Sequence, residues 1–476
     1  MKPTTSDTRV EHDLLGDFVV PATAYYGVHT ARAAQNFTIT GTPISTYPAL
    51  INALAAVKQA AAEANQRLGL LEDQKAQAVI RACKDIRAGQ LHEQFIIDVI
   101  QGGAGTSSNM NANEVIANRA LEHLGHRRGE YTHLHPLQDV NLGQSTNDVY
   151  PTALKIALDG MIVDLLSSLD HLRIALEKKG SEFQDIIKMG RTQLQDAVPM
   201  TLGQEFAAFA TTLAEDQLRL DEGRLLLHEL NLGGTAIGTE LNAHPQYRSY
   251  ALQTLRRITG DETWVSASNL VEATSDVGVF VQLSGILKRT AVKLSKTCND
   301  LRLLSSGPRA GLNEINLPPR QAGSSIMPGK VNPVIPEAVN QVAFEVIGND
   351  LTVTLAAEGG QLQLNAFEPV IAWSLFASLE HLSNASVMLA DKCIDGITAN
   401  HELLQDRVAT SIGLVTAFSP SIGYENASKV AQEALISGRG IIDIVLSKNL
   451  LTQEQIDVLL TSMTTNGHGG TALPSS

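Results

Sequence analysis

The sequence predicts a mainly α protein of three domains, built around a central bundle of long helices. Aromatic residues make up only 4% of the chain whereas Ala and Leu are abundant, and this composition favours helix over strand. Three stretches carry apolar residues at three- and four-residue spacing, and each is longer than an average helix of about 11–12 residues. At 476 residues the chain exceeds one ordinary compact domain, so two or three domains are expected.

Residues 1–145 form the predicted N-terminal domain, in which short segments alternate with loops. The apolar spacing predicts helices over Ala53–Leu68 and Asp73–Ala88. A further helical pattern runs through Val115 and Leu124, after a glycine-rich loop.

Residues 146–402 form the predicted central bundle. Apolar positions predict one long helix from Leu154 to Leu176, a second from Leu202 to Leu230 and a third through Ile286 to Leu301. Thr201 and Gln204 fit a capping box at the start of the second helix. Because these helices carry apolar residues on more than one face, they must be buried on several sides. One chain of this size offers few partners for that burial, so the bundle is expected to be completed by oligomerisation.

Two more helical regions follow, one ending near Gly348 and one covering Leu375–Leu389. A break at Gly396–Asn400 then precedes a small predicted C-terminal domain, residues 403–476. Its tail, Thr464–Ser476, is rich in Gly, Ser and Thr and is predicted to be mobile and to carry no chemistry.

Composition and charge exclude several classes of function. The net charge of −14 argues against nucleic-acid and anionic-membrane partners, because both require a basic surface. The polar N-terminus lacks the apolar core of a signal peptide, and no apolar run reaches the ~20 residues that span a bilayer. Cys83, Cys298 and Cys393 lie far apart and are expected to be reduced, buried thiols. The sequence therefore predicts a soluble, cytoplasmic protein.

Four polar loops, each followed by a helical pattern, are the most informative feature. They are Gly102–Asn109, Gln144–Asp148, Gly190–Asp196 and Gly323–Pro333. Ser, Thr, Asn and Asp before a helix commonly serve only to cap its free N–H groups. Helix N-termini also carry a partial positive charge, so four such loops brought together would bind an anion. A dicarboxylate would suit such a pocket.

The last loop carries the strongest signal. Ser324 and Ser325 lie near a single lysine, Lys330. The loop contains glycines at positions 323 and 329, which permit it to open and close. A phosphate-binding loop has four residues between its first glycine and the Gly-Lys pair, followed by Ser or Thr. Here there are five, followed by Val331. The segment Gly103–Gly105 likewise lacks the third glycine of a dinucleotide fingerprint. The sequence indicates neither a nucleotide nor a metal.

The loop Gly323–Pro333 resembles the signature of the fumarase/aspartase superfamily of lyases. The other three loops match the remaining conserved regions of that superfamily in the same order, and the resemblance extends from about Glu11 to about Leu460. Within the superfamily the chain is most similar to the aspartate ammonia-lyases, through Ala24–Thr30, Gly190–Pro199, Asn313–Pro318 and Val334–Glu337. A class II fumarase usually has His in place of Gln193 and Thr-Gln in place of Val334-Ile335.

The resemblance implies a three-domain fumarase/aspartase-like fold and a role for each matching residue. Ser324 would be the general base that takes a proton from Cβ, and Asn147 would contact the amino group. The β-carboxylate would be held by Thr106, Ser145, Thr146 and Ser325, and the α-carboxylate by Thr192, Lys330 and Asn332. The resemblance further implies a homotetramer whose sites are built from three subunits. It implies no organic cofactor, and modulation by a divalent cation as in some relatives, for which no ligand set is visible.

The chemistry of ammonia elimination suits these residue types. Removing a proton beside a carboxylate creates an enediolate, which requires preorganised donors around its oxygens. Ammonia leaves from an already protonated amine, whereas hydroxide must be protonated to leave, so a hydratase needs an acid such as His. Gln193 cannot serve as that acid, and Glu337 lacks the histidine that would partner it. The predicted reaction is the reversible deamination of L-aspartate to fumarate and ammonia.

Other interpretations stay open at this point. The chain could be a class II fumarate hydratase, a catalytically silent structural relative, or a lyase for another amino-dicarboxylate. Lys330 could be a surface charge, Ser325 could support loop geometry and Asn332 could cap the following helix. His135 is interpreted as structural, and Arg32 and Arg191 as partners in salt bridges.

Overall fold

The structure is a computed structural model that describes residues 8–465. Helices dominate this part of the chain, as predicted, and each sheet in it has only two strands. Nearly all of the predicted mobile tail, Thr464–Ser476, lies outside the described residues.

The described chain folds into two compact units. The first comprises residues up to 166 together with 218–289 and 344–382. The second comprises residues 167–217, 290–343 and those from 383 onward. The division into three domains with boundaries after residues 145 and 402 stays a prediction.

The first unit begins with a hairpin of β1 (Thr8–Asp13) and β2 (Gly16–Pro21), followed by α1 (Val28–Asn36). Three helices then pack on one another: α2 (Pro48–Arg67), α3 (Asp73–Arg87) and α4 (Thr106–His123). The predicted helices in this region are thus confirmed, with ends shifted by a few residues. The unit also contains α7 (Tyr247–Thr259), α8 (Leu270–Ser275) and the short parallel pair β5 (Glu229–Leu230) and β6 (Val265–Ser266).

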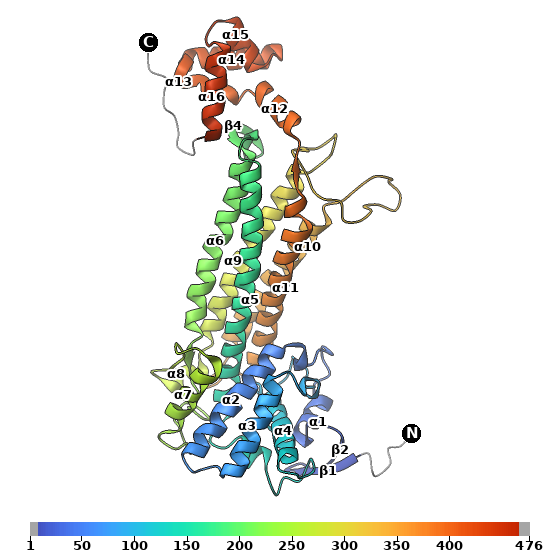
Figure 1. The fold of residues 1–476 in the computed structure, drawn as a ribbon, viewed down its shortest axis with the longest axis vertical. Coiled ribbons are helices and arrows are strands. Elements are labelled where there is room, and N and C mark those ends of the chain that lie inside the picture. The colour runs from blue at the N-terminus through green and yellow to red at the C-terminus, as the bar shows by residue number, and fades with distance from the viewer. Residues whose placement is uncertain (1–7, 466–476) are drawn as a thin grey trace. The chain divides into compact units, whose positions relative to one another are not determined.

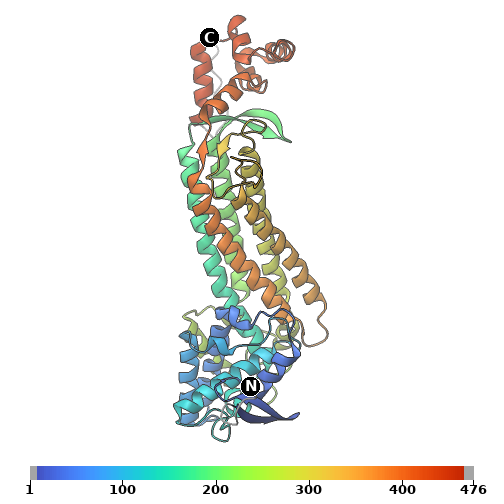
Figure 2. The same cartoon turned by 90° about the vertical axis from the view of Figure 1, so that its right-hand side faces the viewer.

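Five long helices correspond to the predicted bundle. They are α5 (Thr146–Glu182), α6 (Leu202–Leu226), α9 (Gly278–Leu304), α10 (Val334–Glu358) and α11 (Glu368–Lys392). Within each unit their segments run side by side (Figures 1 and 2).

Buried polar contacts join these long helices in both units. In the first unit the Ser284 hydroxyl of α9 donates to Asp350 Oδ1 of α10 at 2.9 Å. In the second the Asn340 amide of α10 donates to Ser295 Oγ of α9 at 2.8 Å. Because an unpaired polar group in a core is costly, such pairs fix the register of one helix against the next.

Two predicted helix ends were wrong. The second long helix ends at Leu226, and Leu230 instead lies in β5, where it pairs with Ser266. The helix predicted to end near Gly348 continues to Glu358. A glycine inside a helix weakens it without ending it, and a side chain at Gly348 would meet no atom within 4 Å, so nothing there forces a break.

The second unit ends in a group of short helices with a core of their own. These are α12 (His401–Thr410), α13 (Leu414–Ile422), α14 (Tyr424–Ser437), α15 (Ile441–Ser447) and α16 (Gln453–Thr465). Phe418, Val430 and Ile444 are fully buried in that core. The hairpin of β3 (Ile187–Thr192) and β4 (Gln195–Thr201) packs on it through Met189. Further along the chain, β7 (Ile315–Asn316) pairs with β8 (Thr398–Ala399).

The three cysteines are buried and unbridged, as predicted. Burial raises the pKa of the Cys83 and Cys393 thiols to about 12, so both thiols stay protonated at neutral pH. Among residues 8–465, no helix has both the length and the apolar composition that crossing a bilayer requires.

A buried carboxyl group at the start of α11 gives the stability of the first unit a distinct pH dependence. Burial raises the pKa of Glu368 to about 8, and the nearby Lys155 only partly opposes this shift. The folded-state pKa lies above the ordinary value of 4.5, so folding loses stability as pH rises from 4.5 to 8. The loss amounts to at most about 1.4 kcal/mol per pH unit.

Glu368→Gln removes this titration. The free energy of unfolding of the variant, relative to the parent, is expected to rise between pH 6 and pH 8 and then to level off. Thermal or denaturant unfolding of both proteins at pH 6, 7, 8 and 9 measures the difference. A difference that does not change with pH would contradict the assignment.

Candidate functional site

Two of the predicted loops begin neighbouring helices in the first unit. Thr106 is the first residue of α4 and Thr146 the first of α5. Gly105, which precedes α4, has φ of +86° and packs so closely on α5 that a Cβ would lie 2.4 Å from the ring of Tyr150. Both the positive φ and the close approach require glycine at this position.

Gly105→Ala is therefore expected to lower the free energy of unfolding by about 3 kcal/mol or more, since it adds overpacking to an unfavourable φ. Gly103→Ala is the matched control. Gly103 has φ of +89° but its Cβ would lie 3.6 Å from the nearest atom, an ordinary contact. Denaturant unfolding should show a distinctly smaller loss for Gly103→Ala. Equal losses would mean that the close packing on Tyr150 does not matter.

Asn109 joins the two helix starts. Its Nδ2 donates to Thr146 Oγ1 at 3.0 Å and to Asn141 Oδ1 at 3.3 Å. Because Thr146 Oγ1 accepts this bond, its own O–H remains available to donate to another group. Asn141 Oδ1 also accepts from the buried Lys58 Nζ at 2.8 Å, and burial lowers the pKa of Lys58 to about 7.

The turn before α5 is held by a buried carboxylate. Asp148 accepts the N–H groups of Ser145 (3.0 Å), Gly233 (3.0 Å) and Thr235 (3.1 Å), while burial raises its pKa to about 6. Asn147 donates through Nδ2 to the carbonyl of Ala236 at 2.7 Å. One N–H of the Asn147 amide is thus in use, and the amide oxygen can accept from a cationic donor.

In the second unit, two hydrogen bonds close the loop 323–333. Gly323 N–H donates to Lys330 O at 2.8 Å, and Asn332 Nδ2 donates to Gly323 O at the same distance. A Cβ at position 323 would lie 2.4 Å from Lys330 O, so the closure requires glycine. In the single chain the amide of Asn332 thus serves the shape of the loop.

Two backbone donors point at Ser324. Its Oγ accepts the N–H groups of Ile326 at 3.2 Å and Met327 at 3.0 Å. Hydrogen bonds of this kind are common where a serine simply stabilises a turn. They also favour a negatively charged oxygen over a neutral one. Ser325 and Lys330 lie on the exposed part of the same loop.

Thr192 lies at the exposed tip of the β3–β4 hairpin, next to a two-residue turn. Both turn residues have positive φ, +53° for Gln193 and +63° for Leu194. Such angles are uncommon for residues with bulky side chains and mark a site where local strain is tolerated. The hairpin is anchored by Arg191, whose guanidinium pairs with the buried Glu314 at 2.5 Å.

The interpretations of several other residues are confirmed. Arg191 forms the salt bridge just described, and Arg32 pairs with Asp13 at 2.9 Å. The capping contact at the start of α6 is reciprocal, since Thr201 N–H donates to Gln204 Oε1 and Gln204 N–H to Thr201 Oγ1, each at 3.0 Å. His135 caps the turn at Pro136–Val140 by accepting N–H groups through Nδ1.

The predicted site residues thus form two sets. Thr106, Ser145, Thr146 and Asn147 belong to the first unit, at the linked starts of α4 and α5. Thr192, Ser324, Ser325, Lys330 and Asn332 belong to the second. Within the described chain, no hydrogen bond joins Thr192 to the loop 323–333. The sequence did not lead us to expect the buried Lys58 beside the first set, although a lysine within an alanine-rich helix can be recognised in the sequence.

Models of known protein families match most of the chain. A family model described as "Lyase" matches residues 16–348, and one described as "Fumarase C C-terminus" matches residues 414–464. The first match alone covers more than half of the chain.

The chain is similar to curated and solved proteins over nearly its whole length. It is 61% identical to an aspartate ammonia-lyase from Pseudomonas aeruginosa, over 97% of both chains. A solved fumarate lyase:delta crystallin from Brucella melitensis bound to cobalt is 55% identical, with a TM-score of 0.93 over 96% of this chain and 99% of that one. A class II fumarase from Schistosoma mansoni is 36% identical, with a TM-score of 0.90 over 96% of this chain and 99% of that one.

Proposed function

Because the chain belongs to the fumarase/aspartase superfamily of lyases, we propose that it eliminates ammonia reversibly from L-aspartate to give fumarate. Its reaction is that of a carbon–nitrogen lyase, and its substrate is a small dicarboxylate. The observation that carries this conclusion is the 61% identity to an aspartate ammonia-lyase, against 36% to a class II fumarase. The TM-scores do not separate the two activities, because one fold hosts both.

We propose that Ser324 is the general base. An isolated serine hydroxyl is a poor base, so its alkoxide must be stabilised. The two N–H groups that point at Ser324 Oγ support this role, and closure of the loop over the substrate would exclude water and strengthen them. The Oγ takes the proton from Cβ, and the electron pair of that C–H bond moves into the adjacent carboxylate as an enediolate.

The second step breaks the bond between Cα and nitrogen. The electron pair of the enediolate forms the C=C bond of fumarate, and the pair of the C–N bond leaves with ammonia. The proton on Ser324 is then lost to ammonia or solvent, which returns the base to its starting state. No acid is needed for this leaving group, which agrees with Gln193 at a position where a hydratase would need an acid.

The remaining predicted residues would hold the two carboxylates and the amine. In the proposed site the β-carboxylate is held by Thr106, Ser145, Thr146 and Ser325, and the α-carboxylate by Thr192, Lys330 and Asn332. Thr146 Oγ1 accepts from Asn109, so its O–H can donate to a carboxylate, which supports the first assignment. Asn147 donates through Nδ2, so its amide oxygen can accept from the amino group. No organic cofactor enters this scheme, and modulation by a divalent cation is part of the same proposal.

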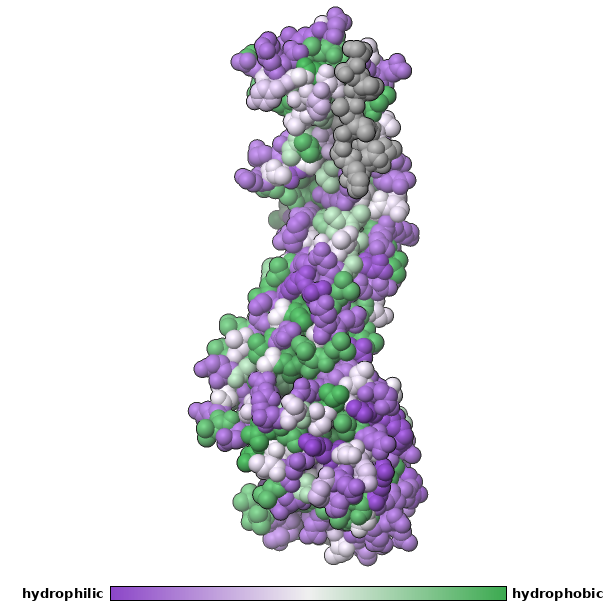
Figure 3. All heavy atoms as spheres, turned by 90° about the vertical axis from the view of Figure 1, so that its left-hand side faces the viewer, coloured by the Kyte–Doolittle hydropathy of each residue, from purple (hydrophilic) through white to green (hydrophobic). Residues whose placement is uncertain are grey.

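We further propose that the two sets of residues meet across subunits of a homotetramer, with three subunits contributing to each site. An exposed apolar stripe on α10 supports association between copies. It comprises Phe344, Ile347, Leu351 and Leu355, which recur every three or four residues and are 38–63% exposed in the single chain. Apolar areas also interrupt the polar surface on the face shown in Figure 3. A cytoplasmic location belongs to the same proposal.

A paired assay on the purified protein tests the reaction. Fumarate absorbs in the ultraviolet, so its appearance can be followed with L-aspartate and with L-malate as the starting compound. The proposal predicts fumarate and ammonia from L-aspartate and no fumarate from L-malate. Turnover of L-malate alone would establish the hydratase instead, and turnover of neither would favour a silent relative or another amino-dicarboxylate.

A further inference from the structure

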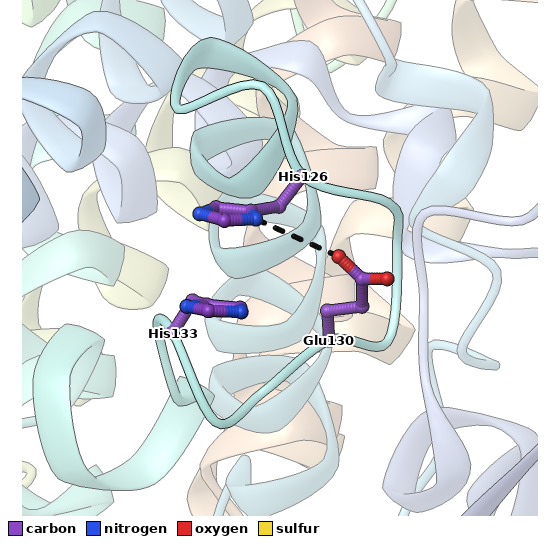
Figure 4. A group of neighbouring side chains, drawn as sticks. All are labelled: His126, Glu130 and His133. Carbon is purple, nitrogen blue, oxygen red and sulfur yellow. Dashed lines mark ion pairs between the residues drawn. The ribbon is translucent and has the colours of Figure 1, made fainter.

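Three potential metal ligands lie on the loop that connects α4 to the turn at Pro136–Val140. They are His126, Glu130 and His133 (Figure 4), and one ligand atom of each lies within 4.8 Å of the others. Nδ1 of His126 is 3.6 Å from Oε2 of Glu130. Two ligands of one ion, each bonded at about 2.1 Å, are separated by a similar distance.

We propose that His126, Glu130 and His133 bind one divalent transition-metal ion, with Zn²⁺ as the preferred ion. Two imidazoles and one carboxylate form a ligand set that Zn²⁺ accepts, with a water molecule in the fourth position. Ca²⁺ and Mg²⁺ are disfavoured because they prefer oxygen ligands. The site is independent of the proposed lyase reaction, since it uses none of the residues assigned to it.

The backbone that carries the three ligands is held in place by other contacts. Asn118 of α4 accepts the Gly129 N–H at 2.8 Å and donates to the Tyr131 hydroxyl at 3.0 Å, so the residues on both sides of Glu130 are fixed. His126 N–H donates to Leu121 O at 2.9 Å, and His133 N–H donates to Glu130 O at 3.0 Å. A site with a preorganised backbone needs only side-chain rotation to bind, which lowers the cost of binding.

Arg127 competes with an ion for the carboxylate of Glu130. Its N–H donates to Glu130 Oε2 at 3.0 Å and its Nε to Oε1 at 2.8 Å. The side chain of Arg127 is 90% exposed, so it can turn into solvent when an ion binds. Arg128 is held by Glu122 at 2.8 Å and does not compete.

The two imidazoles must move relative to each other for both to bind. Their rings are stacked, with centroids 3.8 Å apart and planes at 7°. Lone pairs of nitrogen lie in the ring plane, so those of two parallel rings cannot converge on one ion. Since His133 is exposed, it is the ring that can rotate. Binding of the ion is therefore expected to break the stack.

The ligand cluster opens onto water. A cavity of about 660 Å³ lies beside it and is lined in part by His126, Glu130 and Arg127. An ion can reach the cluster through this cavity, and the water ligand has room there. Bound metal would tie His133 to the end of α4 and clip the loop, which stabilises the folded state by mass action.

The test is Zn²⁺ binding to the full chain after removal of metals with a chelator. Competition with a chromophoric chelator should give one site per chain that is lost or weakened at least about tenfold in His133→Ala and Glu130→Gln. His133→Ala removes an exposed side chain, so the variant is expected to fold, which circular dichroism checks. His401→Ala, which removes another exposed histidine, is the matched control and should bind like the parent.

A spectroscopic readout separates a defined site from loose binding. Co²⁺ in place of Zn²⁺ should give the visible absorption of a cobalt ion with nitrogen and oxygen ligands in the parent and in His401→Ala, but not in His133→Ala. Equal Zn²⁺ affinity of the parent and His133→Ala would overturn the proposal. The proposal would also fail if the parent bound Zn²⁺ no more tightly than both ligand variants do.

Discussion

Ser324→Ala is expected to lower kcat for L-aspartate by about 10⁴-fold, with little change in KM. General base catalysis contributes roughly 10²–10⁴-fold, and the upper end applies here because no other group in the proposed site can accept the Cβ proton. An interaction made only in the transition state lowers kcat and kcat/KM together. Steady-state assays of the parent and the variant measure this split.

Two controls separate the loss of the base from damage to the loop. Ser324→Ala also removes the acceptor for the N–H groups of Ile326 and Met327. Ser325→Ala, on the same loop, removes a hydroxyl without removing those contacts and should cost about tenfold, as one hydrogen bond does. Exchange of the Cβ hydrogen with deuterated water should stop in Ser324→Ala. A variant that still exchanges this hydrogen at the parental rate would show that another group is the base.

Lys330→Ala is expected to lower kcat/KM by about 10²–10³-fold. The ammonium would be the single full positive charge among the assigned residues, and removing one preorganised donor from developing or bound charge typically costs this much. Lys330 is exposed in the single chain, so its loss should leave stability unchanged. Steady-state kinetics measures the effect, with the midpoint of thermal unfolding as the check on stability.

Lys392→Ala is the matched control, because Lys392 is an exposed lysine in the same unit. It should keep parental kcat/KM. Lys330→Arg retains the charge but changes its shape, so partial activity is expected. If Lys330→Ala were as active as Lys392→Ala, the interpretation of Lys330 as an ordinary surface charge would be correct.

Much of the fold could be predicted because it depends on local patterns. Apolar residues at helical spacing located the long helices, and the polar pair Thr201 and Gln204 marked the start of α6 to the residue. The ends at Leu230 and Gly348 were wrong because apolar spacing does not show where a chain turns into a short strand. Nor does a lone glycine show whether a helix ends or continues.

For the candidate site, which stays a prediction, the sequence indicates residue types but not their contacts. Small hydroxyl and amide residues at helix starts identified the loops, but the partners of those residues depend on tertiary packing. The bond from Asn109 to Thr146 joins two helices, and Lys58 reaches Asn141 from a third. The sequence analysis did not identify His126, Glu130 and His133 as potential metal ligands. They lie on an irregular loop, where no periodic pattern predicts that their side chains are close together.

Complementation between two inactive variants tests the proposal that loops from different copies of the chain form one site. Ser324→Ala inactivates the set from the second unit, and the double variant Thr106→Val, Thr146→Val inactivates the set from the first. Mixed oligomers of the two variants, formed by co-expression, contain some sites with no substituted residue if the sets come from different subunits. The mixture is expected to regain L-aspartate deamination that neither variant has alone. Mixed oligomers that stay as inactive as each variant alone would contradict the proposal of shared sites.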